Sequence, residues 1–192
     1  MIYEAIITTE SPEGETHITP MGYTPREEGL MLAPFLPSTT ERNLREGGQA
    51  VVNLTDDVRI FSGCLTGRRE WPLLPAVCVR PRRLEAALAT LEVEVVRIEE
   101  DPVRPRFHCR IMHRENLLPF PGFNRAQGAV IEAAILISRL PMLPPEKVDR
   151  EIEYLTIAVE KTAGERERVA WEWLMQRLRE YRNTDATEVD GA

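Results

Sequence analysis

The sequence predicts a mainly β protein, a small barrel or sandwich of six or seven strands, followed by a C-terminal helical segment. Two observations support this. Residues 1–116 contain short runs rich in β-branched and aromatic residues that end at Pro and Gly turns. After residue 116 the apolar residues recur at helical spacing instead. We therefore expect a barrel domain over 1–116, a helical subdomain over 117–182 and a disordered tail over 183–192.

The strands of the first domain follow from alternation and turn residues. In the run 49–56, Val51, Asn53 and Thr55 should face one way and Val52 and Leu54 the other. The runs 91–100 and 104–115 should pair as a hairpin across Asp101–Pro102. The full set of predicted strands is 3–10, 16–24, 30–36, 49–56, 91–100 and 104–115, with a shorter apolar strand within 71–81.

One short helix interrupts these strands, and three longer ones follow them. Ser38 or Thr39 can cap the short helix, and Gly47–Gly48 ends it. Apolar residues at helical spacing then predict helices from residue 125 to Pro141, from the Pro144–Pro145 pair to about Gly164, and beyond Gly164. Their expected buried stripes are Val130, Ala133, Ala134, Ile137 and Leu140; then Val148, Ile152, Leu155 and Val159; then Val169, Trp173 and Leu178.

Composition narrows the class of protein. The formal net charge of −7 argues against nucleic acid as the main partner, because a phosphate backbone requires a basic surface. Apolar runs are too short for a membrane span, and the start of the chain does not have the pattern of a signal peptide. Three widely spaced cysteines, Cys64, Cys78 and Cys109, favour a reducing, cytoplasmic setting. We expect the cluster of Arg80, Arg82 and Arg83 to lie on the solvent-exposed surface.

Catalytic motifs are missing from the sequence. The three histidines have no metal-ligand spacing, so no metal site is expected, and no nucleophile, dinucleotide or P-loop motif occurs. The residues that stand out are Ser38, Thr39 and Thr40, with Arg42 and Asn43 close behind. A helix N-terminus with several hydroxyls, a guanidinium and an amide is suited to phosphate. A simple helix cap is the alternative.

The order of these segments resembles the FMN-binding split barrel of flavin reductases and pyridoxamine-phosphate-oxidase-like proteins. The resemblance rests on "THITPMGYT" and on "GLMLAPFLPSTTERNLREGGQAVVNLTDD". With "FNRAQGAVIEAAILISRL", the chain more closely resembles an archaeal-type branch of that superfamily, a domain-of-unknown-function family with a helical C-terminal part. This implies a six- or seven-stranded split barrel, FMN as cofactor, and a homodimer with the flavin at the subunit interface.

The resemblance also implies which residues contact the flavin. The second strand would pass along the ring, the hydroxyl turn would hold the phosphate, the fourth strand would reach ribityl or ring atoms, and the start of the C-terminal segment would face the pocket or simply cap its helix. The positions are Thr19, Met21, Gly22, Ser38, Thr39, Thr40, Arg42, Asn43, Asn53, Thr55, Asn124 and Arg125.

The expected function is that of an FMN-binding flavoprotein, a flavin-dependent oxidoreductase of unknown substrate with no catalytic side chain identified. The alternative is a non-catalytic module that binds FMN or a pterin-like ligand. A ligand-free barrel, in which the hydroxyl turn is only a cap, is the structural alternative.

Overall fold

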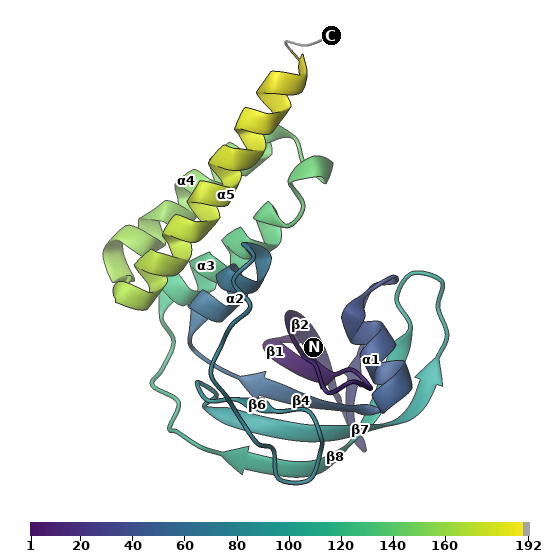
Figure 1. Cartoon of the computed structure of the whole chain (residues 1–192). Helices are drawn as coiled ribbons and strands as arrows, with labels where there is room; N and C mark the ends of the chain where they lie inside the picture. The colour runs from purple at the N-terminus through teal and green to yellow at the C-terminus, as the bar shows by residue number, and fades with distance from the viewer. Residues whose placement is uncertain (190–192) are drawn as a thin grey trace. The chain divides into compact units, whose positions relative to one another are not determined.

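The computed structural model describes residues 1–189 and divides the chain into two compact units. The first comprises residues 1–56 and 70–120, and the second residues 57–69 together with the chain from Pro121 onward (Figure 1). The segment 57–69 therefore belongs to the second unit, although it lies inside the range predicted for the barrel.

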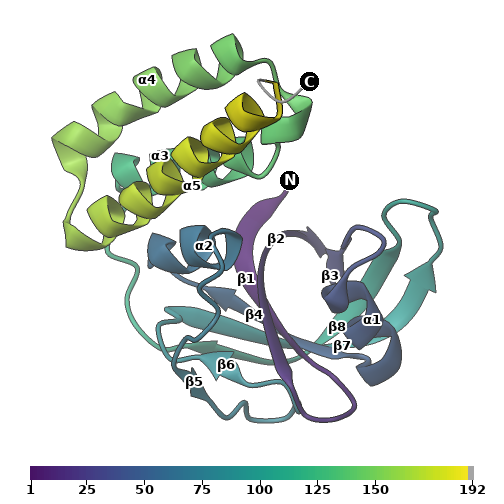
Figure 2. The ribbon, with the colours of Figure 1, turned by 45° about the horizontal axis from the view of Figure 1, so that its top comes forward.

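The first unit is a closed antiparallel barrel with strand order β1-β2-β3-β8-β7-β4 (Figure 2). The mainly β fold with six barrel strands is thus confirmed. A two-stranded ribbon, β5-β6, lies outside the barrel sheet, and β6 was not predicted. The elements are β1 Tyr3–Glu10, β2 Thr16–Arg26, β3 Gly29–Leu32, α1 Thr39–Gly47, β4 Gln49–Leu54, β5 Leu73–Leu74, β6 Arg83–Leu84, β7 Ala89–Glu99 and β8 Arg106–Asn116.

Alternation along the strands builds the barrel core. The Val52 side chain lies in this core. The side chain of its neighbour Asn53 lies on the other face of β4, where it accepts the Leu84 N–H, and this confirms the two faces predicted for the strand. The fully buried side chains include Phe107 and Leu44, so α1 contributes to the core from the end of the barrel. The core cluster consists of Ala5, Ile7, Tyr23, Leu30, Leu32, Leu44, Ala50, Val52, Leu91, Val93, Phe107 and Cys109.

Strand β3 is only four residues long, and this leaves part of β2 with one strand neighbour. β3 pairs with β2 at Tyr23–Arg26 and with β8 at Phe107–Cys109. From Thr16 to Gly22, β2 therefore pairs only with β1 among the described residues. Gly29 makes the tight entry to β3 possible: its φ is +137°, and an added Cβ would lie 2.1 Å from the Cys109 carbonyl oxygen.

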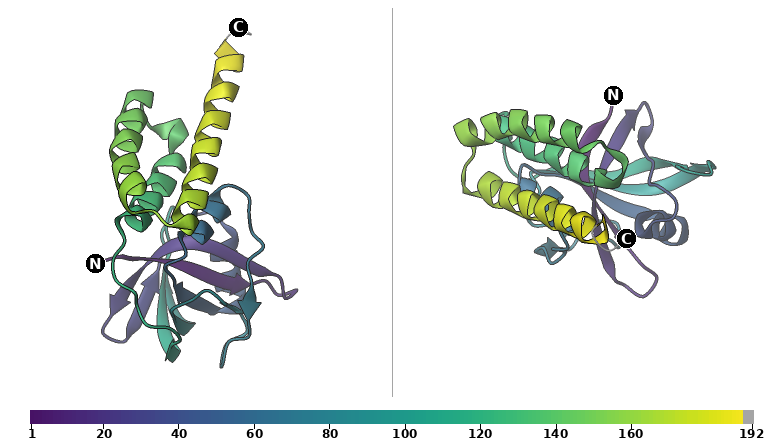
Figure 3. Two further views of the ribbon diagram at one scale, coloured as in Figure 1. Left: turned by 90° about the vertical axis from the view of Figure 1, so that its left-hand side faces the viewer. Right: turned by 90° about the horizontal axis from the view of Figure 1, so that it is seen from above.

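The second unit is helical, with α2 Val58–Leu65, α3 Arg125–Ile137, a 3-10 turn Leu140–Met142, α4 Pro145–Thr162 and α5 Glu165–Val189 (Figure 3). The stripes predicted for α3 and α4 pack in its core. The stripe predicted for α5 was wrong by one residue at its start: Ala170 and Leu174 are fully buried, whereas Val169 and Trp173 are only half-buried.

Two further differences concern the helices. The sequence patterns did not predict α2, a short helix that starts after the cap Asp57 and packs Val58 against the apolar face of α3. α5 continues to Val189, so it includes part of the segment expected to be disordered, and residues 190–192 lie outside the described range. None of the described helices is both long and apolar enough to span a membrane.

Candidate functional site

The N-terminus of α1 is built around Ser38, which is its N-cap. The Ser38 backbone is extended, and its Oγ accepts the N–H of Glu41 at 3.2 Å. Thr39 and Thr40 are the first two residues of the helix, where backbone N–H groups have no partner within the helix. Gly48 ends the helix in the left-handed conformation, as predicted. The helix cap is therefore real, but it uses only one of the three hydroxyls.

Asn43 lies one turn after Thr39 and Thr40, on the same side of α1. It is 1% exposed, and its Nδ2 donates to the Thr9 hydroxyl at 3.1 Å. Its Oδ1 is buried and has no hydrogen-bond partner among residues 1–189. Because an amide can be turned over, either its oxygen or its nitrogen is available for a ligand, while the other atom bonds Thr9. An unpaired buried amide atom is costly, so this position favours a ligand or ordered water.

Thr39 and Arg42 are exposed beside these buried groups, while Thr40 is 3% exposed. Their hydroxyls and the guanidinium can donate hydrogen bonds to an anion at the end of the helix, where the helix dipole also favours negative charge. The structure thus brings together all five polar residues predicted for the phosphate turn: Ser38, Thr39, Thr40, Arg42 and Asn43.

The predicted ring-contacting residues lie on the part of β2 that has only one strand neighbour. Met21 packs against the barrel core, and Gly22 lies under the Ile2 side chain, whose Cγ2 would be 2.5 Å from an added Cβ. The Thr19 hydroxyl contacts the Pro20 carbonyl at 3.5 Å. A free strand edge presents backbone N–H and C=O groups that a ligand can contact.

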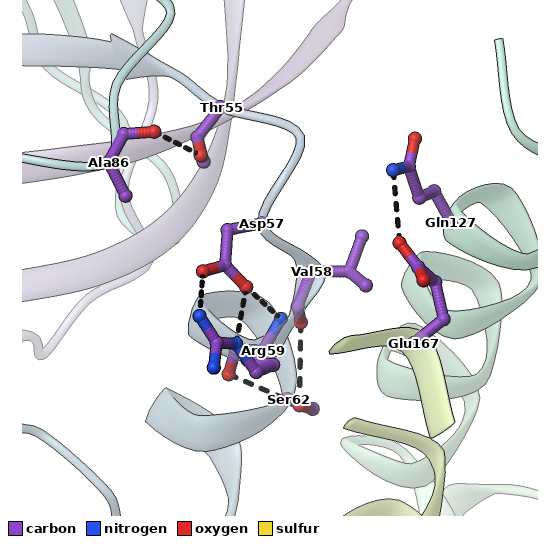
Figure 4. Close-up of polar contacts among 8 residues, drawn as sticks. All are labelled: Thr55, Asp57, Val58, Arg59, Ser62, Ala86, Gln127 and Glu167. Atoms are coloured by element: carbon purple, nitrogen blue, oxygen red, sulfur yellow. Dashed lines mark hydrogen bonds and ion pairs between the residues drawn. The ribbon is translucent and has the colours of Figure 1, made fainter. Parts of the chain in front are cut away.

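Asn53 and Thr55 are bound within the protein rather than beside α1. The Asn53 amide is fully buried; its Nδ2 donates to the Ile6 carbonyl at 3.0 Å, and its Oδ1 accepts the Leu84 N–H at 2.8 Å. The Thr55 hydroxyl donates to the Ala86 carbonyl at 2.8 Å (Figure 4). These contacts attach β6 and the residues after it to the end of β4, and both polar atoms of Asn53 already have partners.

Asn124 and Arg125 belong to the second unit. Asn124 is the N-cap of α3: its Oδ1 accepts the Ala126 N–H at 2.8 Å, and its Nδ2 donates to the Thr162 carbonyl at 3.0 Å. Arg125 is exposed. The capping alternative thus accounts for every polar atom of the Asn124 amide, and a contact of either residue with a cofactor stays a prediction.

Three buried carboxylates were not identified from the sequence, and all three are bound by neighbouring groups. Asp57 caps α2 and pairs with Arg59, and Glu167 accepts the Gly164 N–H at 2.9 Å and the Gln127 amide at 3.1 Å (Figure 4). Glu92 accepts two backbone N–H groups, from Val77 and Cys78, each at 2.7 Å. Two of them have partners close in the sequence, Arg59 for Asp57 and Gly164 for Glu167, whereas the partners of Glu92 lie 15 and 14 residues away and give no local signal.

These groups are not arranged for acid–base or nucleophilic chemistry. Burial works against ionisation of Glu92, but the N–H groups of Val77 and Cys78 outweigh it, so its pKa is lowered and it stays charged. Burial raises the pKa of the Cys109 thiol to about 12. Burial, with the Glu92 carboxylate, also raises the pKa of Cys78. Among residues 1–189, no group of three or more His, Cys, Asp or Glu side chains could hold a metal ion.

Comparison with known proteins agrees with this architecture. The chain is similar to the FMN-bound protein MM1853 from Methanosarcina mazei, a DUF447 protein, with a TM-score of 0.78 and 18% identity over 92% of this chain and 94% of that one. It is also similar to an NADH:FAD oxidoreductase from Streptomyces globisporus, with a TM-score of 0.52 and 10% identity over 60% and 72% of the two chains.

A third similar structure is a homolog of nitrilotriacetate monooxygenase component B from Mycobacterium thermoresistibile, with a TM-score of 0.52 and 15% identity over 62% of this chain and 71% of that one. No curated protein sequence matches the chain. The predicted FMN-binding split-barrel fold is confirmed by these likenesses. Residues 3–117 match the model for the N-terminal domain of a protein of unknown function (DUF447), and residues 124–176 match the model for protein of unknown function (DUF447). The chain therefore belongs to the DUF447 family.

Proposed function

We propose that this protein binds FMN and holds the phosphate at the N-terminus of α1. The observation that carries the proposal is the buried Asn43 amide: one of its atoms has no partner in the part of the chain that the structure describes, and it lies one turn from Thr39 and Thr40. The helix cap needs only Ser38, so the remaining donors exceed what the fold requires. The FMN-bound relative with the same fold supports the choice of FMN over other phosphate esters.

The donor set fits a phosphate group. A dianion requires several donors, and the first turn of α1 offers backbone N–H groups, the hydroxyls of Thr39 and Thr40 and the guanidinium of Arg42. The open edge of β2 at Thr19–Gly22 can align a planar ring through backbone contacts. In this proposal Asn53 and Thr55 keep the barrel together, since their side chains already bond Leu84 and Ala86.

We further propose that the protein is an oxidoreductase. The bound flavin would supply the hydride and electron transfer, and the chain would supply binding and orientation. This division of work agrees with the raised pKa values of Cys78 and Cys109, which keep both thiols protonated. A non-catalytic FMN carrier is the second candidate, because the raised pKa values of Cys78 and Cys109 favour neither as an activated thiol. Bleaching of bound flavin by NADH or NADPH under anaerobic conditions separates the two.

A homodimer with the flavin at its interface is also proposed. Apolar side chains on the outside of the barrel strands support it, since Val96 on β7 is 59% exposed and Met112 on β8 is 44% exposed. Light scattering of the purified protein gives the mass directly; a monomer with full FMN affinity would contradict this part. A cytoplasmic location stays a prediction from the number and spacing of the cysteines.

The test of the phosphate site compares FMN with riboflavin, which lacks the phosphate. Thr40→Ala combined with Asn43→Ala should weaken FMN binding by at least about 100-fold, because each hydrogen bond to a charged group contributes about 1.5–3 kcal/mol. Riboflavin binding should change little, so the ratio of the two affinities reports on the phosphate rather than on folding. Thr39→Ala with Arg42→Ala, at exposed positions, should lower the same ratio without affecting the barrel core.

The matched control is Asn183→Ala with Thr184→Ala, a neighbouring amide and hydroxyl pair that is exposed on α5. It should leave both affinities unchanged. An unchanged ratio of FMN to riboflavin affinity in both site variants would remove the phosphate assignment.

A further inference from the structure

The turn between β7 and β8 has a fixed shape. The Asp101 Oδ1 accepts the N–H of Val103 at 2.9 Å and that of Arg104 at 2.8 Å. These N–H groups, that of Arg104 foremost, lower the pKa of Asp101, so the carboxylate stays charged and keeps both bonds at neutral pH. A side chain that bonds its own backbone two and three residues on is a common device for fixing a turn.

This turn contacts residues 33–37, the segment that leads into α1. The Arg104 guanidinium donates to the Ala33 carbonyl from Nε at 3.0 Å and from Nη2 at 2.8 Å. Its carbon Cζ lies 4.4 Å from the centre of the Phe35 ring, and the Leu36 N–H donates to the Val103 carbonyl at 2.9 Å. Residues 33–37 have no helix or strand of their own, so these contacts locate them.

A second attachment lies on the helix side. Arg45, in the last turn of α1, bonds both carboxylate oxygens of Glu100, at 2.8 and 3.0 Å, and it also bonds Glu41 at 2.7 Å. The β7–β8 turn thus contacts the chain on both sides of Ser38, before the cap through Arg104 and after it through Glu100. Figure 2 shows α1 beside the end of the β7–β8 hairpin.

We propose that the turn formed by residues 100–104 presets the phosphate-binding turn and that Arg104 is its main positioning residue. The inference rests on the proposed function of α1 and goes beyond it, because Arg104 lies 71 residues from Ala33 in the chain and does not itself belong to the phosphate turn. A turn held in its binding conformation before the ligand arrives does not lose binding energy to ordering.

Arginine is specifically required in this role. Its planar group donates two hydrogen bonds to one carbonyl while its face lies on the Phe35 ring, and a lysine ammonium cannot make both contacts. Arg104→Lys should therefore behave like Arg104→Ala, although it preserves the charge. This separates positioning by geometry from a general electrostatic attraction between the protein and the phosphate.

The experiment uses three variants of the full chain: Arg104→Ala, Arg104→Lys and the control Arg110→Ala. Arg110 is an exposed arginine of β8 that pairs with Glu94 at 2.9 Å, away from residues 33–37. The first readout is amide hydrogen exchange of Leu36 without ligand. Exchange should become about tenfold faster in both Arg104 variants and stay unchanged in the control, since only the Arg104 variants lose the contacts with Ala33 and Phe35 that hold Leu36 against Val103.

The second readout is the ratio of FMN to riboflavin affinity. It should fall about tenfold in both Arg104 variants, with riboflavin affinity and the control within about twofold of the original protein. Faster exchange with an unchanged ratio would overturn the positioning role and leave a purely structural contact. Unchanged exchange of Leu36 would overturn the claim that Arg104 holds residues 33–37 in place. If the original protein binds FMN and riboflavin equally, the proposed phosphate site fails, and the positioning role fails with it. The exchange of Leu36 would still show whether Arg104 holds residues 33–37 in place.

Discussion

The N-termini of α1 and α3 start alike and differ in what surrounds the cap. At α3, Asn124 caps the helix and its second amide atom bonds the Thr162 carbonyl, while the Thr162 hydroxyl also accepts the Ala126 N–H at 3.1 Å. At α1, Ser38 completes the cap, and the hydroxyls of two threonines and one atom of a buried amide follow. The buried Asn43 Oδ1, which has no hydrogen-bond partner among residues 1–189, thus distinguishes a candidate ligand site from a cap that serves the fold.

Two buried asparagines make the same distinction within the barrel unit. Asn53 and Asn43 are both 1% exposed or less. Asn53 bonds β1, β4 and Leu84 through both ends of its amide, whereas the Asn43 amide bonds only Thr9 within residues 1–189. The fold accounts for the burial of Asn53. The burial of Asn43 is accounted for only if a ligand or ordered water bonds its remaining amide atom.

The largest expected effect tests this pair. Asn53→Ala should lower the free energy of unfolding by about 3–5 kcal/mol, because it strands the Leu84 N–H and the Ile6 carbonyl in the interior, at about 1–3 kcal/mol for each unsatisfied group. Asn43→Ala should cost only about 1–2 kcal/mol, since it removes one hydrogen bond. Urea unfolding of the ligand-free proteins measures both. Equal losses would mean that Asn43 has structural partners of its own.

A fully partnered charge gives the next effect. The lowered pKa of Glu92 means that its carboxylate stabilises the fold above the usual carboxyl range, and that this contribution is lost as the pH falls through its pKa in the folded protein. Glu92→Gln should therefore cost about 1–3 kcal/mol near pH 7, with the difference from the original protein shrinking on acidification. Unfolding followed from pH 7 to pH 3 tests this; a difference that grows with acid would contradict it.

The smallest effect sharpens the comparison of the two caps. Asn124→Ala and Ser38→Ala should each cost about 1 kcal/mol of stability through the lost cap. Only Ser38→Ala should also change the affinity for FMN, since it disturbs the first turn of α1. Thermal unfolding and FMN titration of the same two proteins provide the measurement. A loss of FMN affinity in Asn124→Ala would instead give Asn124 the cofactor role that the sequence predicted for it.

The regular pattern of the chain accounts for what could be predicted. Strand alternation, the Gly48 stop and the Asn124 cap are local signals, and the structure follows each of them. The α2 helix was not predicted because its eight residues are too few to show a helical repeat of apolar positions. Partners distant in sequence had no signal at all: Asn53 with Leu84, Glu92 with Val77, and Arg104 with Ala33 exist only once the barrel closes.

The most direct measurement of the central claim is a calorimetric titration of the purified, flavin-free protein with FMN and with riboflavin, side by side. A phosphate held by the first turn of α1 predicts that FMN binds at least about 100-fold more tightly, since two or more charge-assisted hydrogen bonds act on the phosphate alone. Equal affinities, or no binding of either flavin, would contradict the account and leave Ser38–Asn43 as a helix N-terminus with no ligand.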